Sequence, residues 1–149
     1  MTTAGDREAR QDVADVLVRY ATGIDTRDWD LFRTCFTTDC HAHYEDIGTW
    51  DGVEAITDFM AVSHAALGET MHRISNIAVT IDGDTARARS YVDAMIMTAD
   101  GKGGINPAGW YQDELVRTPD GWRIARRHSK VVHYRTIGDW APPEGTSAT

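Results

Sequence analysis

The stretch YATGIDTRDW, from Tyr20 to Trp29, decides how this chain folds. Apolar residues precede it at helical spacing, so a helix that begins at about Asp6 is predicted to end here, with Ile24 as the last residue of its buried stripe. Asp25 follows directly, just before a second short helix. A carboxylate next to the buried stripe can point toward the interior more readily than one on the exposed face of the helix. We therefore predict that Asp25 borders an apolar pocket.

Length and composition are those of an ordinary globular chain. Its 149 residues suffice for a single domain, 1–149, with a core at about 6–137 and an irregular tail at 138–149. The net charge of −8 argues against nucleic acid and anionic membranes as partners, because both bind basic patches. We expect neither a transmembrane helix nor a signal sequence, because no run of about 18 apolar residues occurs and the first residues contain no apolar segment. We expect a cytoplasmic protein in which Cys35 and Cys40 stay reduced.

The spacing of apolar residues changes once along the chain, from the period of a helix to that of a strand. Helices followed by a meander of long strands indicate an α+β fold. Because long strands twist and curl, helices packed on one face would enclose a cone-shaped pocket. Beyond the first helix, the expected elements are helices at 29–36 and 53–67, the second of them ended by Gly68, and strands at 41–44, 71–81, 85–98, 109–117 and 122–135, with a turn at 48–52 and a glycine-rich loop at 99–107.

His72 is the partner that we predict for Asp25. A buried carboxylate holds a neutral imidazole in one tautomer, and the other ring nitrogen can then exchange a proton near neutral pH. The alternative is that Asp25 caps the following loop and His72 is an ordinary strand residue. Tyr20 lies five positions before Asp25 and could border the same cavity, where a phenol can donate a hydrogen bond to a carbonyl or a leaving hydroxyl. It could equally be a core residue.

The predicted strand at 85–98 carries a carboxylate within an apolar run. Alternation places Asp93 on the face of Tyr91, Met95 and Met97, where a charge needs a partner. The alternative is that this face is solvated, because two arginines of the strand share it. We expect Asp93 to contact the substrate, in a pocket whose apolar and aromatic lining comprises Phe59, Met60, Met95, Met97 and Trp110.

The remaining motifs concern ions and charged ligands. His41 and His43 project to one face of a predicted strand, but no further ligand spacing supports them, so we expect neither a metal nor a cofactor. The glycines at 101–104 lack the Lys-Ser/Thr that completes a phosphate-binding loop. Near the end of the last strand, Arg135 is the arginine that we expect to face the pocket. There it could hold a substrate carboxylate or balance a buried aspartate.

Three motifs have a recognisable combination: D-x-x-D-W at 25–29, T-x-H-x-I-x-N at 70–76 and D-G-W-R-I at 120–124. Together they resemble the SnoaL-like branch of the nuclear transport factor 2-like (NTF2-like) superfamily, over roughly 6–135. The resemblance implies a cone-shaped fold of three N-terminal helices on a curved, mostly antiparallel sheet. It also implies that Asp25 and His72 form the Asp–His pair of the family's dehydratases. Tyr20 and Arg135 then match the tyrosine and the late arginine of bile-acid 7α-dehydratases, whereas Ile24 departs from the tyrosine of scytalone dehydratase.

The function expected from this resemblance is a cofactor-independent dehydratase (a lyase) or isomerase. Its substrate would be a small polycyclic, polyketide- or steroid-like carbonyl compound, deprotonated by His72 while Tyr20 steadies the developing oxyanion. Alternatives within the fold are a noncatalytic binding or assembly module, like a dioxygenase β subunit, and a polyketide cyclase. An epoxide hydrolase is a further alternative, to which Asp93 would contribute one carboxylate. The family also suggests a homo-oligomer, either a dimer or a trimer.

Overall fold

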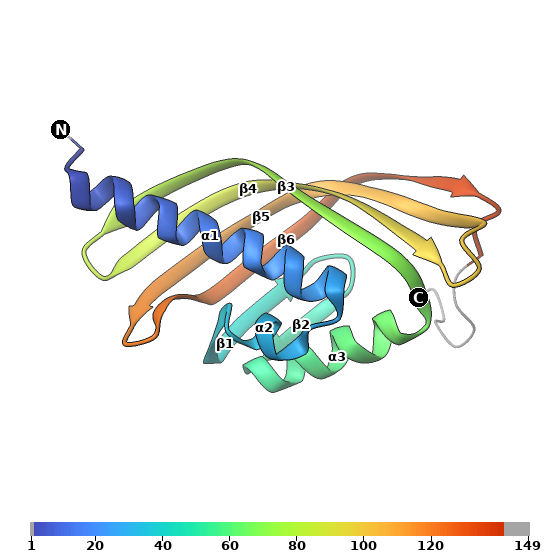
Figure 1. The fold of residues 1–149 in the computed structure, drawn as a ribbon, viewed down its shortest axis with the longest axis horizontal. Helices are drawn as coiled ribbons and strands as arrows, with labels where there is room; N and C mark the ends of the chain where they lie inside the picture. Colours follow the sequence, from blue (N-terminus) through green and yellow to red (C-terminus); the bar gives the residue numbers. More distant parts are fainter. Residues whose placement is uncertain (1, 142–149) are drawn as a thin grey trace.

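The strands form one curved sheet, and the helices cover one side of it (Figure 1). The computed structural model describes residues 2–141 of the chain. The elements are helices α1 (Ala4–Thr26), α2 (Trp29–Arg33) and α3 (Val53–Ala65), and strands β1 (Phe36–Tyr44), β2 (Gly48–Asp51), β3 (Leu67–Asp82), β4 (Thr85–Thr98), β5 (Gly103–Thr118) and β6 (Gly121–Gly138).

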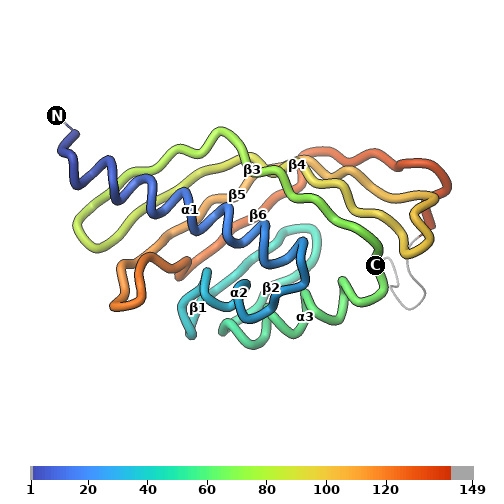
Figure 2. The backbone as a smooth tube through the Cα atoms, viewed as in Figure 1, coloured from blue at the N-terminus to red at the C-terminus, as the bar shows by residue number. Residues whose placement is uncertain are grey.

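The sheet has the order β2-β1-β6-β5-β4-β3. Neighbouring strands are antiparallel except β1 and β6, which run parallel. Helix α1 packs across the sheet, while α2 and α3 lie beside β1 and β2 (Figure 2). This arrangement confirms the predicted α+β, NTF2-like fold. Among residues 2–141, no helix combines the length and the apolar character that crossing a bilayer requires.

Helix α1 begins and ends with specific caps. Thr3 accepts a hydrogen bond from the backbone of Asp6, whose side chain accepts one from the backbone of Thr3, so the helix starts slightly earlier than predicted. It ends where Arg27 adopts a left-handed conformation with φ of 58°. Gly23 allows α2 to come close, because a Cβ at this position would lie 2.9 Å from the backbone nitrogen of Phe32.

Several predicted boundaries were wrong, chiefly because strand pairing extends into glycine-containing segments. The predicted turn at 48–52 contains β2, which pairs with β1. Gly68, expected to end α3, already belongs to β3, and the glycine-rich loop is short because β5 begins at Gly103. Phe36 begins β1 instead of ending a helix. Most of the predicted tail lies outside the described residues, and Gly138 still pairs with Gly103.

Strand β3 contains one irregularity that changes which side chains face the helices. The pairing with β4 shifts between Ser75 and Ala78, and Asn76 has a left-handed φ of 51°. Before the shift the even-numbered residues, such as His72, are the better buried ones. After it, the odd-numbered residues are better buried, as the exposure pattern of Ile77 and Val79 shows.

A fully buried ion pair joins β5 and β6 beneath the aromatic core. Asp113 and Arg127 lie opposite each other in the sheet, and their side chains have no exposed surface. The carboxylate accepts two hydrogen bonds from the guanidinium, at 2.8 and 2.9 Å. Burial alone would lower the pKa of Arg127, but Asp113 and the neighbouring phenols raise it well above its usual value. The guanidinium is therefore a permanent charge inside the core.

Removing the partner of this charge should destabilise the fold strongly. Asp113→Asn leaves a buried guanidinium without a counter-ion, so we expect the free energy of unfolding to fall by about 3–5 kcal/mol. The matched control is Asp84→Asn, which breaks an exposed ion pair with Arg117 and should cost less than about 1 kcal/mol. Urea denaturation of the three proteins measures both changes, and equal losses in the two variants would contradict the prediction.

Candidate active site

Asp25 and His72 are in direct contact, as the sequence predicted. The Nδ1 atom of His72 lies 2.7 Å from Oδ1 of Asp25, and the backbone nitrogen of His72 donates to Oδ2 at 2.7 Å. Strand β3 is an edge strand, so backbone N–H groups that point away from β4 need partners outside the sheet. The carboxylate at the end of α1 satisfies one of them and positions the imidazole at the same time.

Arg27 holds the helix end against β3. Its guanidinium donates to the hydroxyl oxygen of Thr70 and to the carbonyl oxygen of Gly68, both at 2.8 Å. The hydroxyl of Thr70 in turn donates to Oδ1 of Asp25 at 3.0 Å. Asp25 therefore accepts three hydrogen bonds from β3, and the arginine two residues later fixes the segment that supplies them.

These contacts determine both the charge of Asp25 and the tautomer of His72. Burial alone would raise the pKa of Asp25, but the hydrogen bonds that the carboxylate accepts from His72 and Thr70 lower it below its usual value. An ionised carboxylate only accepts hydrogen bonds, so Nδ1 of His72 carries the proton. Nε2 is then the free nitrogen of a side chain that lines an apolar cavity.

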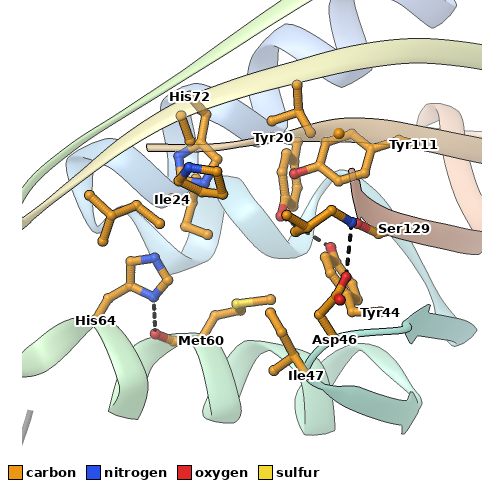
Figure 3. Close-up of a pocket in the computed structure, with 16 residues that line it drawn as sticks. Tyr20, Ile24, Tyr44, Asp46, Ile47, Met60, His64, His72, Tyr111 and Ser129 are labelled. Carbon is orange, nitrogen blue, oxygen red and sulfur yellow. Dashed lines mark hydrogen bonds between the residues drawn. The ribbon is translucent and has the colours of Figure 1, made fainter. Parts of the chain in front are cut away.

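The cavity lies between the helices and the sheet (Figure 3). Its volume is about 120 Å³, and aliphatic and aromatic side chains make up most of its wall. A compact ligand would be largely enclosed there. The polar and aromatic side chains that line it are those of Tyr20, Tyr44, Asp46, His64, His72, Tyr111 and Ser129.

Tyr20 belongs to a cluster of phenols backed by the buried arginine. Its hydroxyl lies 3.1 Å from that of Tyr44. The guanidinium carbon of Arg127 lies 4.2 Å from the ring centre of Tyr20 and 3.9 Å from that of Tyr111. Burial raises the pKa of Tyr20 and Tyr44 well above the usual value, so both phenols are neutral hydrogen-bond donors.

His64 is a second imidazole in the cavity wall, and sequence reasoning missed it. Its side chain is buried, and Nδ1 lies 2.8 Å from the carbonyl oxygen of Met60, which can only accept a hydrogen bond. Nε2 is consequently unprotonated, and it is buried without a hydrogen-bond partner. Burial lowers the pKa of His64 to about 4, so the ring is neutral at pH 7. Figure 3 shows this nitrogen turned toward the cavity, below His72.

Most of the other predicted pocket residues lie elsewhere. Val92, Ala94 and Ile96 line the cavity from β4, so Asp93 and its alternate neighbours face the other side of the sheet. There Asp93 pairs with Arg73 at 3.3 Å and accepts a hydrogen bond from Asn106, which also accepts one from Arg135. Among the predicted lining residues, Met60 does line the cavity, whereas Phe59, which packs on Trp50, and Met95, Met97 and Trp110 do not.

Comparison with known proteins gives a consistent family assignment. The sequence model of the SnoaL-like domain matches residues 6–128. Protein Rv2910c of Mycobacterium tuberculosis is 33% identical over 129 residues, which cover 85% of this chain and 88% of that protein. A crystal structure of a proposed aromatic ring hydroxylase from Novosphingobium aromaticivorans is 30% identical, with a TM-score of 0.79 over 89% of this chain and 94% of that one.

A proposed scytalone dehydratase from the same bacterium has the same fold. Its TM-score is 0.79 at 20% identity, over 93% of this chain and 94% of that one. The fold and the family therefore agree with the resemblance that the three motifs indicated.

The hydrogen bonds to Asp25 should make part of the stability depend on pH. Because the folded protein lowers the pKa of this carboxyl below its ordinary value of 3.8, its ionised form stabilises the fold above about pH 4. That contribution is lost as the pH falls through the lower, folded-state pKa. The difference in unfolding free energy between the wild type and Asp25→Asn should therefore shrink as the pH is lowered from 7 to 3. A constant difference in urea denaturation across this range would contradict the assignment.

Proposed function

Because this chain belongs to the SnoaL-like domain family, we propose that it is a cofactor-independent dehydratase or isomerase of a small carbonyl compound. The family and fold neighbours include proposed dehydratases, and the observation that carries the proposal is the Asp25–His72 contact at 2.7 Å beside an apolar cavity. The expected substrate class is polycyclic, polyketide- or steroid-like, and a cavity of about 120 Å³, below the about 300–1,000 Å³ of typical ligand pockets, favours its smallest members.

The base in this proposal is Nε2 of His72. It removes a proton from the carbon next to the substrate carbonyl, and ionised Asp25 stabilises the imidazolium that forms. The electron pair of the broken C–H bond moves toward the carbonyl oxygen. It then returns to form a carbon–carbon double bond as a hydroxyl on the next carbon departs. The proton on Nε2 leaves with that hydroxyl as water, so the enzyme is regenerated.

Tyr20 and Tyr44 would stabilise the oxyanion. One hydrogen of the two phenols serves the bond between them, which leaves the other for a ligand in the cavity. The guanidinium of Arg127 lies over the ring of Tyr20 and donates a hydrogen bond to the hydroxyl of Tyr44. Removing a single oxyanion donor typically lowers turnover by about 10²–10³-fold, and a positioned general base supplies about 10²–10⁴-fold.

His64 favours dehydration over isomerisation. Its unprotonated Nε2 can accept a hydrogen bond but cannot donate one, so its complement on a ligand is a hydroxyl or N–H group. A buried acceptor without a partner costs about 1–3 kcal/mol, which a hydroxylated ligand would recover. We therefore propose a hydroxy-carbonyl substrate whose hydroxyl binds His64.

The alternatives make different demands on the site. Epoxide hydrolysis by an Asp–Arg–Asp set would need Asp93 beside Asp25, but Asp93 is paired with Arg73 on the other side of the sheet. A noncatalytic binding module does not need an Asp–His pair at a cavity. A module of that kind would bind ligands without exchanging their protons with solvent. Proton exchange therefore distinguishes an enzyme from a binding protein, even before the natural substrate is identified.

Turnover should depend on His72 and Asp25 as one unit. We expect His72→Ala to lower kcat by at least about 10²-fold, because the base is removed. In Asp25→Asn, the amide offers only one acceptor oxygen to the backbone N–H and the Nδ1–H of His72. If Nδ1 faces the amide NH₂ group, it must accept a hydrogen bond, so the proton moves to Nε2 and the base is lost. The double variant should be little slower than His72→Ala alone.

The assay is a screen of hydroxy-ketones, followed by ultraviolet absorbance of the conjugated product and by deuterium uptake in D₂O. EDTA should leave turnover unchanged, since no proposed step uses a metal. The tautomer of His72 is read from its ¹⁵N shifts. If the loss of kcat in the double variant equals the product of the losses in Asp25→Asn and His72→Ala, then Asp25 acts independently of His72. Direct proton abstraction by the carboxylate then becomes the better mechanism. Near-normal turnover in folded His72→Ala would remove the base assignment.

The role of His64 predicts a specific change in substrate preference. His64→Phe keeps an aromatic ring but removes the acceptor, so KM for hydroxylated substrates should rise by about 10-fold, equivalent to about 1.4 kcal/mol. Binding of a ketone analogue without the hydroxyl should change little. The measurement is KM and the analogue's Ki in both proteins. Equal losses for substrate and analogue would show that His64 only shapes the cavity.

A further inference from the structure

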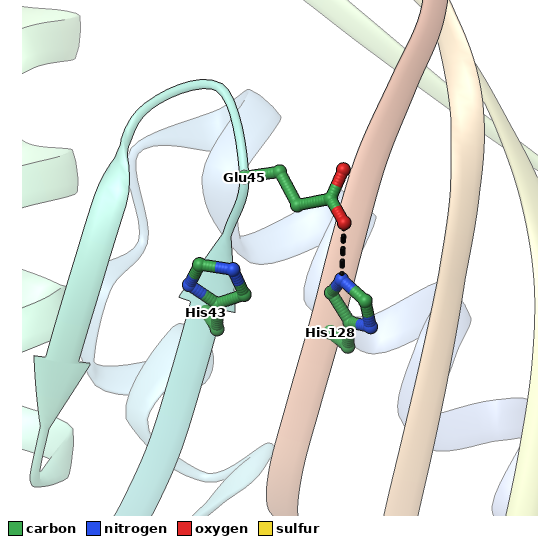
Figure 4. A group of neighbouring side chains, drawn as sticks. All are labelled: His43, Glu45 and His128. Atoms are coloured by element: carbon green, nitrogen blue, oxygen red, sulfur yellow. Dashed lines mark hydrogen bonds and ion pairs between the residues drawn. The ribbon is translucent and has the colours of Figure 1, made fainter.

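A second group of chemically active side chains lies on the face of the sheet that the helices do not cover. It consists of His43 and Glu45 at the end of β1 and His128 on β6 (Figure 4). Each of these residues offers a ligand atom, and the three atoms lie within 4.8 Å of one another. Their neighbours in sequence, such as Tyr44 and Ser129, face the cavity instead. We refer to the three as the outer-face cluster.

The parallel pairing of β1 and β6 creates this cluster. His43 lies directly opposite His128 in the register, and the ring centres are 5.3 Å apart. Glu45 is two residues beyond His43 and therefore projects to the same side. Its carboxylate lies 2.9 Å from Nε2 of His128. The sequence does not reveal this cluster, because His128 comes from a strand 85 positions after His43 in the chain.

Neighbouring contacts orient the two imidazoles and fix the backbone of Glu45. Nδ1 of His43 lies 2.8 Å from the hydroxyl of Thr49, which leaves Nε2 free. The ring of Trp110 packs edge-on against His128 with 5.1 Å between centres. The backbone of Glu45 is anchored by a 3.0 Å hydrogen bond to the carbonyl oxygen of Ser129. Such supporting contacts around the ligands are typical of metal sites.

We propose that the outer-face cluster binds a divalent transition-metal ion of the zinc type. Two imidazoles and one carboxylate are a common zinc ligand set, which leaves further positions for water. Imidazole nitrogen selects zinc, copper, nickel or cobalt over magnesium and calcium, which prefer oxygen ligands. Small side-chain rotations would bring the donors to about 2.0–2.2 Å from one ion.

The ion would replace a proton and displace a lysine. A proton now lies between Nε2 of His128 and Oε1 of Glu45. A metal ion bound to these two atoms would take the place of that proton, which would move to Nδ1 of His128 or to solvent. Nζ of Lys130 lies 3.7 Å from the second carboxylate oxygen and competes for it. A metal bound here would cross-link β1 to β6 in the folded protein, so it should raise the melting temperature.

The test is isothermal titration of the chelator-treated 149-residue chain with ZnCl₂, supported by Co²⁺ absorption spectra and thermal melts. We expect one Zn²⁺ per chain and a melting temperature that rises with zinc concentration. His43→Ala and His128→Ala should each weaken zinc binding by at least about 10-fold. Lys130→Gln should tighten it, because the competing cation is gone.

Two matched variants make the result specific. His133→Ala removes an exposed histidine of the same strand outside the cluster and should bind zinc like the wild type. His72→Ala removes the cavity imidazole and should also leave zinc binding unchanged. Zinc binding that survives His128→Ala but is lost in His72→Ala would place the metal in the cavity and overturn the proposal. Absence of stoichiometric binding to the wild type would overturn it as well.

Discussion

The carboxylate of Asp25 connects the two halves of this fold. It ends a long helix and accepts hydrogen bonds from the side chain and backbone of an edge strand, so one group satisfies the strand's free N–H and orients an imidazole. Arg27 reinforces the same junction through Thr70 and Gly68. The position of His72 is therefore set by backbone contacts and does not depend on side-chain packing alone. In the proposed role as base, an imidazole held in this way would need little reorganisation before it accepts a proton.

The cavity separates its charges from its neutral polar groups. Asp25 is ionised but does not itself line the cavity, the lining carboxylate of Asp46 is exposed, and the charge of Arg127 is neutralised by Asp113 behind the phenol rings. The groups that face the interior, His64 and the tyrosine hydroxyls, are neutral at pH 7 because burial shifts their pKa values away from it. A neutral apolar ligand can enter such a space without an unpaired charge being buried.

The sequence predicted the fold and the Asp25–His72 pair, but it did not predict the pocket wall. Helix α1 was recognisable because its apolar stripe has one clear period, and the pair was recognisable from three motifs. The faces of β4 were assigned wrongly because apolar side chains occur on both of them: Val92 and Ala94 face the cavity, whereas Tyr91 is 46% exposed on the other side. His64 could have been found only as a polar residue on the buried face of α3.

The left-handed Asn76 in β3 limits how this chain can change over evolution. Each residue added to or removed from a strand exchanges its two faces, so β3 can present both His72 and the core residues Ile77 and Val79 only because one extra residue lies between them. Loss of that residue would turn either the imidazole or the core side chains toward water. Substitutions can therefore accumulate along β3, whereas its length between these positions is fixed by the two roles it serves.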